Sequence, residues 1–195
     1  MSKKNKLFFE IDQSINLKKK LLKLEKQISK AIDKIYYTLK NNGKIFICGN
    51  GGSAADAQHL SAEFLIRLNP KINRKPFPIV SLAMDSSTLT ACGNDYGFKY
   101  IFSRNLRGLA SKKDLLISIS TSGNSKNIIE VLKQSKKMGI FSISFLGSGG
   151  GLAKKFGNLN LLVPHRNVAR IQECHIFLGH FILNQVEKKL LTKTK

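Results

Sequence analysis

Two side chains that can move protons or bind a metal ion follow a glycine-rich stretch in the first third of the chain. The sequence from Gly43 to Glu63 reads GKIFICGNGGSAADAQHLSAE, which places His59 and Glu63 four positions apart. If this segment is helical, both side chains lie on one face. An imidazole and a carboxylate at that spacing can act as an acid–base pair or as two ligands of a metal ion.

The residues before this pair predict an anion-binding site. Ile45 to Cys48 is a continuous apolar run, as expected of a buried strand, and three glycines that allow tight turns follow it at positions 49, 51 and 52. Ser53 is a good N-cap, and residues 54–63 favour a helix. A helix N-terminus offers free N–H groups and the positive end of its dipole to a phosphate. An ordinary strand-to-helix turn would carry the same features, so this stretch alone leaves both interpretations open.

The glycine-rich stretch differs from the two common nucleotide-binding loops. No Lys-Ser or Lys-Thr pair follows the glycines, which excludes a Walker A loop. The order GNGGSA lacks the G-x-G-x-x-G spacing of the dinucleotide fingerprint, and no acidic residue closes a following strand about 20 residues later.

A second polar cluster, STSGNS, occupies residues 120–125. Four hydroxyl groups surround Gly123 there, from Ser120, Thr121, Ser122 and Ser125. Hydroxyls together with helix N–H groups can hold a phosphate monoester without a lysine. A simple helix cap would need only one of them, Ser125, so the four hydroxyls favour a phosphate site.

The end of the chain carries further polar side chains in the segment RIQECHIFLGH, among them Gln172, His175 and His180. In a helix, Gln172 and His180 lie about 12 Å apart along the axis and about 80° apart around it. Their side chains can meet only near the level of residue 176, and only if both extend toward it. A histidine in such a helix usually packs in the core or lies at the surface, so the geometry alone does not assemble a site.

The elements that must position these groups alternate between strand and helix. Apolar runs predict strands at 45–48, 79–83, 115–119, 141–146 and 160–163. Periodic patterns predict helices at 5–41 (one helix or two), 54–63, 86–91, 98–109, 128–138 and 168–191. The segment CGNDYGF is expected to break the helix at 86–91, and the polar, proline-marked residues 69–78 are expected to form a loop.

Because the predicted strands are apolar throughout, they indicate a parallel sheet covered by helices on both faces, in the α/β class. Ligands of such sheets bind beyond the carboxyl ends of the strands, where GNGGS and STSGNS lie. We expect one domain over residues 1–195, with an N-terminal helix at about 5–41 and the sheet domain at about 43–191.

The composition, with 42% hydrophobic and 23% charged residues, is ordinary for a soluble globular protein, but the net charge of +21 is unusual. Only six of the 33 basic residues are Arg, and the lysines are spread along the chain without interleaved aromatic residues. No nucleic-acid partner is therefore expected. The charge still favours anionic substrates through electrostatic steering.

Signals for membranes or secretion are missing from the sequence. No apolar run reaches transmembrane length, and MSKKNKLFFEIDQS contains no signal-peptide core. The cysteines, at positions 48, 92 and 174, are odd in number and follow no paired spacing. These features predict a cytoplasmic protein with reduced thiols and no membrane partner.

Four motifs in combination, CGNGGSAADAQHLSAE, GNDYGF, ISTSGNS and RIQECHIFLGH, resemble the phosphoheptose isomerases of the sugar-isomerase (SIS) domain family. The resemblance covers nearly the whole chain. STSGNS alone indicates only a phosphosugar-binding SIS domain, whereas AQH-x₃-E together with RIQE-x₆-H is typical of the phosphoheptose isomerases.

The resemblance implies a flavodoxin-like sheet of five parallel strands with a long N-terminal helix, a homotetramer with active sites between subunits, and one zinc ion per subunit. The zinc ligands that it implies are His59, Glu63, Gln172 and His180, and Glu63 and His180 also match the acid–base pair. The implied contacts to a seven-carbon phosphosugar come from Asn50, Gly51, Gly52, Ser53, Glu63, Asn94, Asp95, Ser120, Thr121, Ser122, Ser125 and Gln172. No role beyond packing is expected for His175.

The implied reaction converts D-sedoheptulose 7-phosphate to D-glycero-D-manno-heptose 7-phosphate, for the heptose precursor of the lipopolysaccharide core. A carboxylate suits the transfer of the carbon proton, an imidazole suits the oxygen proton, and a metal can polarise the carbonyl. One alternative is a non-catalytic SIS-domain regulator that binds the replication-initiator protein, but that relative departs at Glu63 and His180, which this chain retains. A transcriptional regulator with an SIS sensor domain would need a helix-turn-helix segment, for which the N-terminal helix leaves little room.

Overall fold

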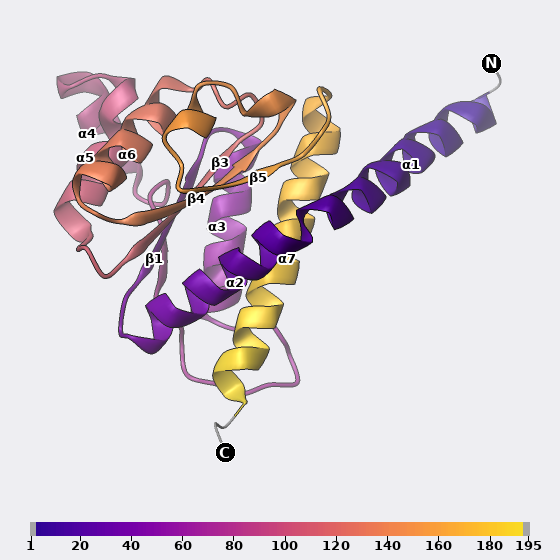
Figure 1. The fold of residues 1–195 in the computed structure, drawn as a ribbon. Helices are drawn as coiled ribbons and strands as arrows, with labels where there is room; N and C mark the ends of the chain where they lie inside the picture. Colours follow the sequence, from indigo (N-terminus) through magenta and orange to yellow (C-terminus); the bar gives the residue numbers. More distant parts are fainter. Residues whose placement is uncertain (1–2, 193–195) are drawn as a thin grey trace.

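A sheet of five parallel strands forms the centre of the molecule, in the order β2-β1-β3-β4-β5 (Figure 1). The computed structural model describes residues 3–192, so residues 1–2 and 193–195 of the domain predicted over 1–195 lie outside the described part. The strands are β1 (Ile45–Gly49), β2 (Ile79–Ser81), β3 (Leu115–Ser120), β4 (Phe141–Leu146) and β5 (Leu159–Leu162). This is the flavodoxin-like strand order, and it confirms the predicted α/β fold.

Helices cover both faces of the sheet. The α-helices are α1 (Lys3–Lys20), α2 (Glu25–Lys40), α3 (Gly52–Leu65), α4 (Ser86–Asp95), α5 (Ile101–Leu109), α6 (Lys126–Lys137) and α7 (Val168–Leu191). Short 3-10 turns are η1 (Leu21–Leu24), η2 (Phe98–Tyr100), η3 (Ser148–Gly150) and η4 (Ala153–Lys155). None of the helices within residues 3–192 is both long enough and apolar enough to cross a membrane.

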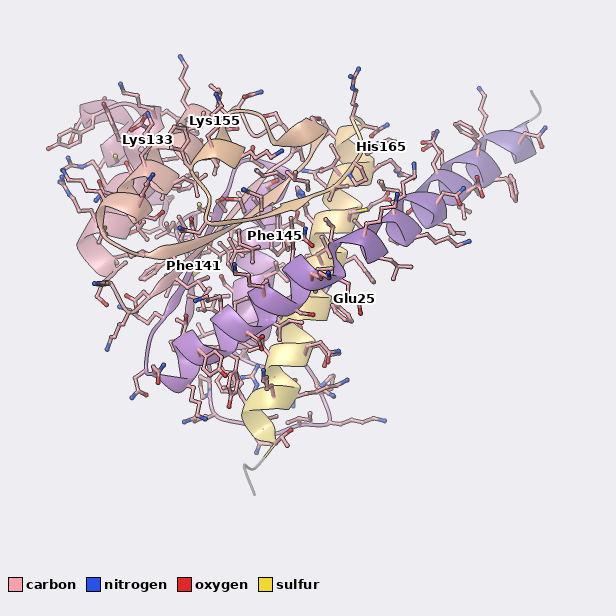
Figure 2. The ribbon with its side chains drawn as sticks, viewed as in Figure 1. Glu25, Lys133, Phe141, Phe145, Lys155 and His165 are labelled. Atoms are coloured by element: carbon pink, nitrogen blue, oxygen red, sulfur yellow. The ribbon has the colours of Figure 1, made fainter. Side chains whose placement is uncertain are left out.

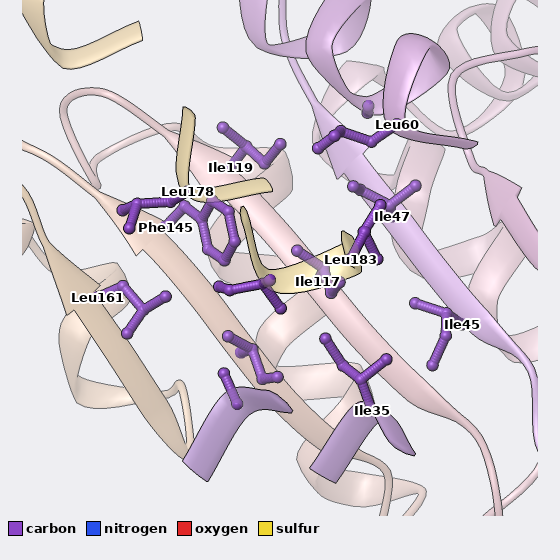
Figure 3. Close-up of a cluster of buried hydrophobic side chains, with 14 of the residues drawn as sticks. Ile35, Ile45, Ile47, Leu60, Ile117, Ile119, Phe145, Leu161, Leu178 and Leu183 are labelled. Atoms are coloured by element: carbon purple, nitrogen blue, oxygen red, sulfur yellow. The ribbon is translucent and has the colours of Figure 1, made fainter. Parts of the chain in front are cut away.

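Alternate residues of each strand feed two separate hydrophobic clusters. Ile45 and Ile47 of β1 pack into one cluster with α2, α3 and α7, of which Figure 3 shows a part. Phe46 and Cys48 point the opposite way, into a cluster with α4, α5 and α6. Because both faces are covered, the strands carry apolar residues at nearly every position. The three cysteines of the chain are buried and unpaired, as predicted.

Side chains fill the space between the helices and the sheet, with Phe145 of β4 inside and Lys155 at the surface (Figure 2). The N-terminal segment differs from these packed layers. It consists of two helices separated by η1, and α1 projects away from the sheet (Figure 1). Apolar side chains of α1 are consequently exposed, namely Leu7, Phe8, Phe9, Ile11 and Ile15.

The predicted break of the helix at 86–91 is wrong, because α4 continues through the residues CGND to Asp95. The carboxylate of Asp85 accepts hydrogen bonds from the N–H groups of Ser87 and Thr88, which stabilises the first turn. The chain leaves the helical conformation only afterwards, and Gly97 has a φ of 93°. Asn94 and Asp95 therefore lie in the last turn of a helix and not in a loop.

His175 packs in the core, as predicted. Its side chain is fully buried between α7 and β4, with its ring centroid 6.1 Å from that of Phe145. Neither ring nitrogen has a hydrogen-bond partner among the described residues. Burial lowers the pKa of His175 to about 4. The histidine is therefore neutral at physiological pH.

We expect His175 to make the protein less stable in mild acid. An unfolded histidine titrates near pH 6.5, so between about pH 6.5 and 4 the unfolded chain binds more protons than the folded one. The contribution of the neutral histidine is complete above this range, and about 3 kcal/mol of unfolding free energy should be lost as the pH falls through it. Chemical denaturation at several pH values should show a flatter profile for His175→Leu. If the unfolding free energy depended on pH equally in the two proteins, this role of His175 would be refuted.

Candidate active site

The two glycine-containing motifs follow neighbouring strands and lie at the carboxyl end of the sheet, as predicted. β1 and β3 are paired neighbours, with Gly49 opposite Ile119 near their carboxyl ends. The side-chain amides of Asn50 and Asn127 exchange two hydrogen bonds of 2.8 Å each. This pair ties the loop after β1 to the first turn of α6, which follows the STSGNS loop.

The hydroxyl groups of the STSGNS loop keep protons to donate. Ser120 Oγ accepts a hydrogen bond from the Gly123 N–H at 3.0 Å, and Ser122 Oγ accepts one from the Asn124 N–H at 3.1 Å. Because a hydroxyl can accept and donate at once, each keeps a proton to donate. Ser122 is exposed, whereas Ser120 is buried with 4% of its surface exposed. Ser125 occupies the N-cap position of α6, but its side chain makes no capping hydrogen bond. The alternative role of this serine as a simple cap is therefore not realised.

Gly123 is required for the shape of this loop. It adopts a φ of 65°, and a Cβ there would overlap the carbonyl oxygen of Gly150 in η3. The carbonyl of Gly123 accepts a hydrogen bond of 2.8 Å from the Ala153 N–H. The loop is therefore packed against the chain that follows β4, which fixes the positions of its hydroxyl groups.

The prediction of Ser53 as the N-cap of the next helix is wrong. α3 begins at Gly52, and Gly51 occupies the N-cap position with φ 54° and ψ −123°. This conformation suits only glycine, and it lets the Ser53 and Ala54 N–H groups donate to the carbonyls of Asn50 and Gly51. Ser53 is consequently buried within the first turn of α3.

Two histidines from different helices meet two turns further along α3. The Nε2 atoms of His59 (α3) and His180 (α7) lie 2.8 Å apart. Glu63 Oε1 lies 3.9 Å from His59 Nε2. The side chains of His59 and Glu63 remain 48% and 27% exposed, so the group can be reached from solvent. The structure thus brings together three of the four predicted metal ligands, including both residues of the predicted acid–base pair.

Gln172 lies at the other end of the helix pair. A Cβ on Gly52 would overlap the Gln172 side chain, so the amide rests on the first residue of α3. His180 is about 12 Å further along α7. Within one chain the amide therefore belongs to the phosphate-loop end, and its role as a metal ligand stays a prediction.

Asn94 and Asp95 have a different environment from the other predicted contacts. Their exposed side chains hydrogen-bond to each other at 2.9 Å, at the end of α4. In the described part of the chain, no hydrogen bond joins them to the phosphate loops or to the histidine pair.

The electrostatics of the site favour a neutral His180. Burial lowers the pKa of this imidazole, the neighbouring His59 lowers it further, and Glu63 opposes both effects.

Sequence reasoning missed Asp56, which lies on α3 one turn after Gly52. Burial raises the pKa of Asp56, and the charge of His59 opposes that rise. The i, i+3 spacing from Asp56 to His59 is the signal that could have identified it.

The donor atoms of the histidine pair and Glu63 suit zinc, which binds imidazole nitrogen and carboxylate oxygen. Two nitrogens bound to one tetrahedral zinc ion lie about 3.3 Å apart, given Zn–N distances of about 2.0–2.1 Å. The observed separation of 2.8 Å is shorter, so the histidines would have to open slightly. As they stand, no three His, Cys, Asp or Glu side chains within residues 3–192 form a group ready to hold a metal ion.

The SIS domain family matches residues 11–147 of this five-stranded α/β fold. Phosphoheptose isomerases of Campylobacter concisus (53% identity over 151 residues, 77% of this chain and 79% of the relative) and Clostridium acetobutylicum (42% over 190 residues, 96% of each) are similar in sequence. A solved phosphoheptose isomerase structure from Neisseria gonorrhoeae matches with a TM-score of 0.88 at 38% identity, covering 96% of this chain and 100% of that one. The chain therefore belongs to the phosphoheptose isomerases, a family of aldose–ketose isomerases.

The packing of Gly123 can be tested against a second glycine of similar conformation. Gly149 has a φ of 81°, but a Cβ there would meet nothing within 4 Å. Gly149→Ala should cost only the left-handed backbone strain, about 1–2 kcal/mol of unfolding free energy. Gly123→Ala should cost more and should also weaken phosphosugar binding, because the loop must move away from Gly150. Urea denaturation and binding titrations check both. Equal losses of stability would show that the contact with Gly150 is unimportant.

Proposed function

We propose that the chain converts D-sedoheptulose 7-phosphate to D-glycero-D-manno-heptose 7-phosphate through an ene-diol intermediate. The product would supply the heptose of the lipopolysaccharide core, in the cytoplasm, without a nucleic-acid or membrane partner. The observation that carries the proposal is the convergence of His59, Glu63 and His180, about two helical turns along α3 from the glycine loop at its start. The same convergence disfavours the non-catalytic regulator, since a binding protein would not need an acid–base pair there.

The length of the site suits a seven-carbon phosphosugar. The hydroxyls of residues 120–125 and the N-terminus of α3 would hold the phosphate. His59 lies seven residues after Gly52, which is about 10 Å along the helix. An extended seven-carbon chain with its phosphate at the loop places carbons 1 and 2 at that level. The reacting end of the sugar would then lie beside Glu63 and His180.

The two side chains divide the proton transfers between them. Glu63 would remove a proton from carbon 1 of the ketose and return it to carbon 2, while His180 would move a proton between the two oxygens. A neutral His180 suits this task because it can both accept and donate a proton near neutral pH. Zinc, with His59, Glu63, His180 and Gln172 as its proposed ligands, would supply a Lewis acid that polarises the carbonyl.

Incubation of the purified protein with sedoheptulose 7-phosphate, followed by identification of the product, tests the proposal directly. Glu63→Gln should abolish the conversion, because an amide cannot take up the carbon proton. The variant should unfold near the wild-type temperature, since the Glu63 side chain is partly exposed. Activity within tenfold of wild type would exclude Glu63 as the base.

Assembly into a homotetramer with active sites between subunits is part of the same proposal. The apolar side chains of α1 that project into solvent would be covered by other copies of the chain. A groove of about 630 Å³ between η1, α2 and α7 continues this surface and is lined by exposed Leu22, Phe177 and Phe181. Phe181 follows His180 directly, so an interface there would border the catalytic group.

If subunits complete one another's sites, activity per subunit should fall when the enzyme is diluted below its dissociation constant. Sedimentation and activity assays over one concentration series measure the two together. Leu22 lies at the exposed surface of η1. Leu22→Glu should therefore shift both the sedimentation curve and the activity curve to higher protein concentration. Full specific activity in a demonstrated monomer would place every essential group within one chain.

A further inference from the structure

Asp56 is a carboxylate of the site region that the proposed reaction does not use. It lies on α3 one turn after Gly52 and slightly less than one turn before His59. At about 100° per residue, Gly52, Asp56, His59 and Glu63 fall within an arc of about 60° on this helix. The Asp56 carboxylate therefore lies on the same helix face as His59 and its partner Glu63.

One oxygen of this carboxylate has no donor. Within residues 3–192, Asp56 Oδ2 is buried and accepts no hydrogen bond. A buried carboxylate oxygen without a donor is costly, so native structures nearly always provide one. Burial raises the pKa of Asp56, and the His59 imidazole, when it is protonated, opposes that rise. His59 is thus the side chain whose charge affects the pKa of Asp56.

His59 has an unused nitrogen that matches this oxygen. Its Nε2 atom makes the contacts of the site, 2.8 Å from His180 Nε2 and 3.9 Å from Glu63 Oε1. Its Nδ1 atom makes no hydrogen bond in the described part of the chain. For the 2.8 Å contact to be a hydrogen bond between neutral rings, one Nε2 must donate and the other must accept. The partner of the other ring nitrogen decides which ring donates.

We propose that Asp56 is a positioning residue that accepts a hydrogen bond from the Nδ1–H of His59. The two residues are three positions apart on one face of α3, the spacing at which helical side chains are neighbours. The proton on Nδ1 leaves His59 Nε2 with a free lone pair, so His180 Nε2 carries the proton and donates it to His59. A carboxylate behind an imidazole also raises its basicity toward a metal ion. Asp56 would thereby set the metal-binding atom of His59 and, in the metal-free protein, the nitrogen of His180 that carries the proton.

The tautomers can be read by nitrogen-detected NMR of the metal-free protein labelled at its four histidines. At neutral pH the wild type should show His59 protonated at Nδ1 and His180 protonated at Nε2. Asp56→Ala, a change that favours the helix, should remove the preference of His59 for Nδ1–H. The matched control is Asp12→Ala, at an exposed site of α1, which should leave both tautomers unchanged.

Zinc affinity, measured by competition with a chelating dye, is the second readout. Asp56→Ala should weaken zinc binding about 10- to 100-fold, and Asp12→Ala should not. Only this measurement rests on the proposed function. A wild type that does not bind zinc would contradict the proposed metal while leaving the tautomer test intact.

The wild-type spectrum decides the question even if Asp56→Ala does not fold. A His59 protonated at Nε2 in the wild type would overturn the role of Asp56. Unchanged tautomers together with unchanged zinc affinity in a folded Asp56→Ala protein would also overturn it, and would leave the carboxylate as a structural group.

Discussion

The close approach of α3 to α7 is the contact on which the candidate site depends. Leu60 of α3 packs against Gly179 of α7, where a Cβ would lie 2.5 Å from Leu60 Cδ1. The residues next to this contact in each helix are His59 and His180, whose Nε2 atoms lie 2.8 Å apart. A glycine inside a helix costs about 1 kcal/mol relative to alanine. Gly179 destabilises the middle of α7 by this amount, but it allows α3 to approach closely enough for the two histidines to meet.

The same helix pair also holds the phosphate end of the site. Gln172, two turns before Gly179, lies on Gly52 at the start of α3. Both helices begin beyond the carboxyl ends of strands, so the sheet sets their positions and Gly51 sets the entry into α3. The predicted phosphate loop and the histidine pair are therefore positioned by the same two helices. A change in the contact between these helices would move the histidines relative to that loop.

Much of the fold follows from local sequence patterns. Continuous apolar runs identified all five strands, and the predicted bounds of β4 and α7 agree with the structure to the residue. The neighbouring positions of GNGGS and STSGNS follow from the general behaviour of parallel sheets. Those features depend on apolar burial and chain direction, which can be inferred from local sequence patterns. The family motifs added His59, Glu63 and His180, and the structure places these three together.

The features that were missed depend on contacts between distant residues or on the geometry of single turns. Ser53 has the side chain of an N-cap, but the conformation available to Gly51 starts the helix earlier. α4 begins at a cap formed by Asp85 and continues through CGND to Asp95. The position of Gln172 depends on how α7 lies on α3, which helical periodicity cannot specify. Asp56 was visible at the correct spacing, but only the structure shows that, within residues 3–192, one of its oxygens is buried without a donor.

The projecting apolar face of α1 has a consequence for the solution conditions in which copies of the chain can meet. Each copy carries a net charge of +21, so contact between copies brings together surfaces of the same sign. The hydrophobic attraction of α1 and the Coulomb repulsion of the lysines oppose each other, and only the repulsion is screened by salt. If copies of the chain associate through α1, rising ionic strength would therefore strengthen their contact, in the direction opposite to an interface held by salt bridges.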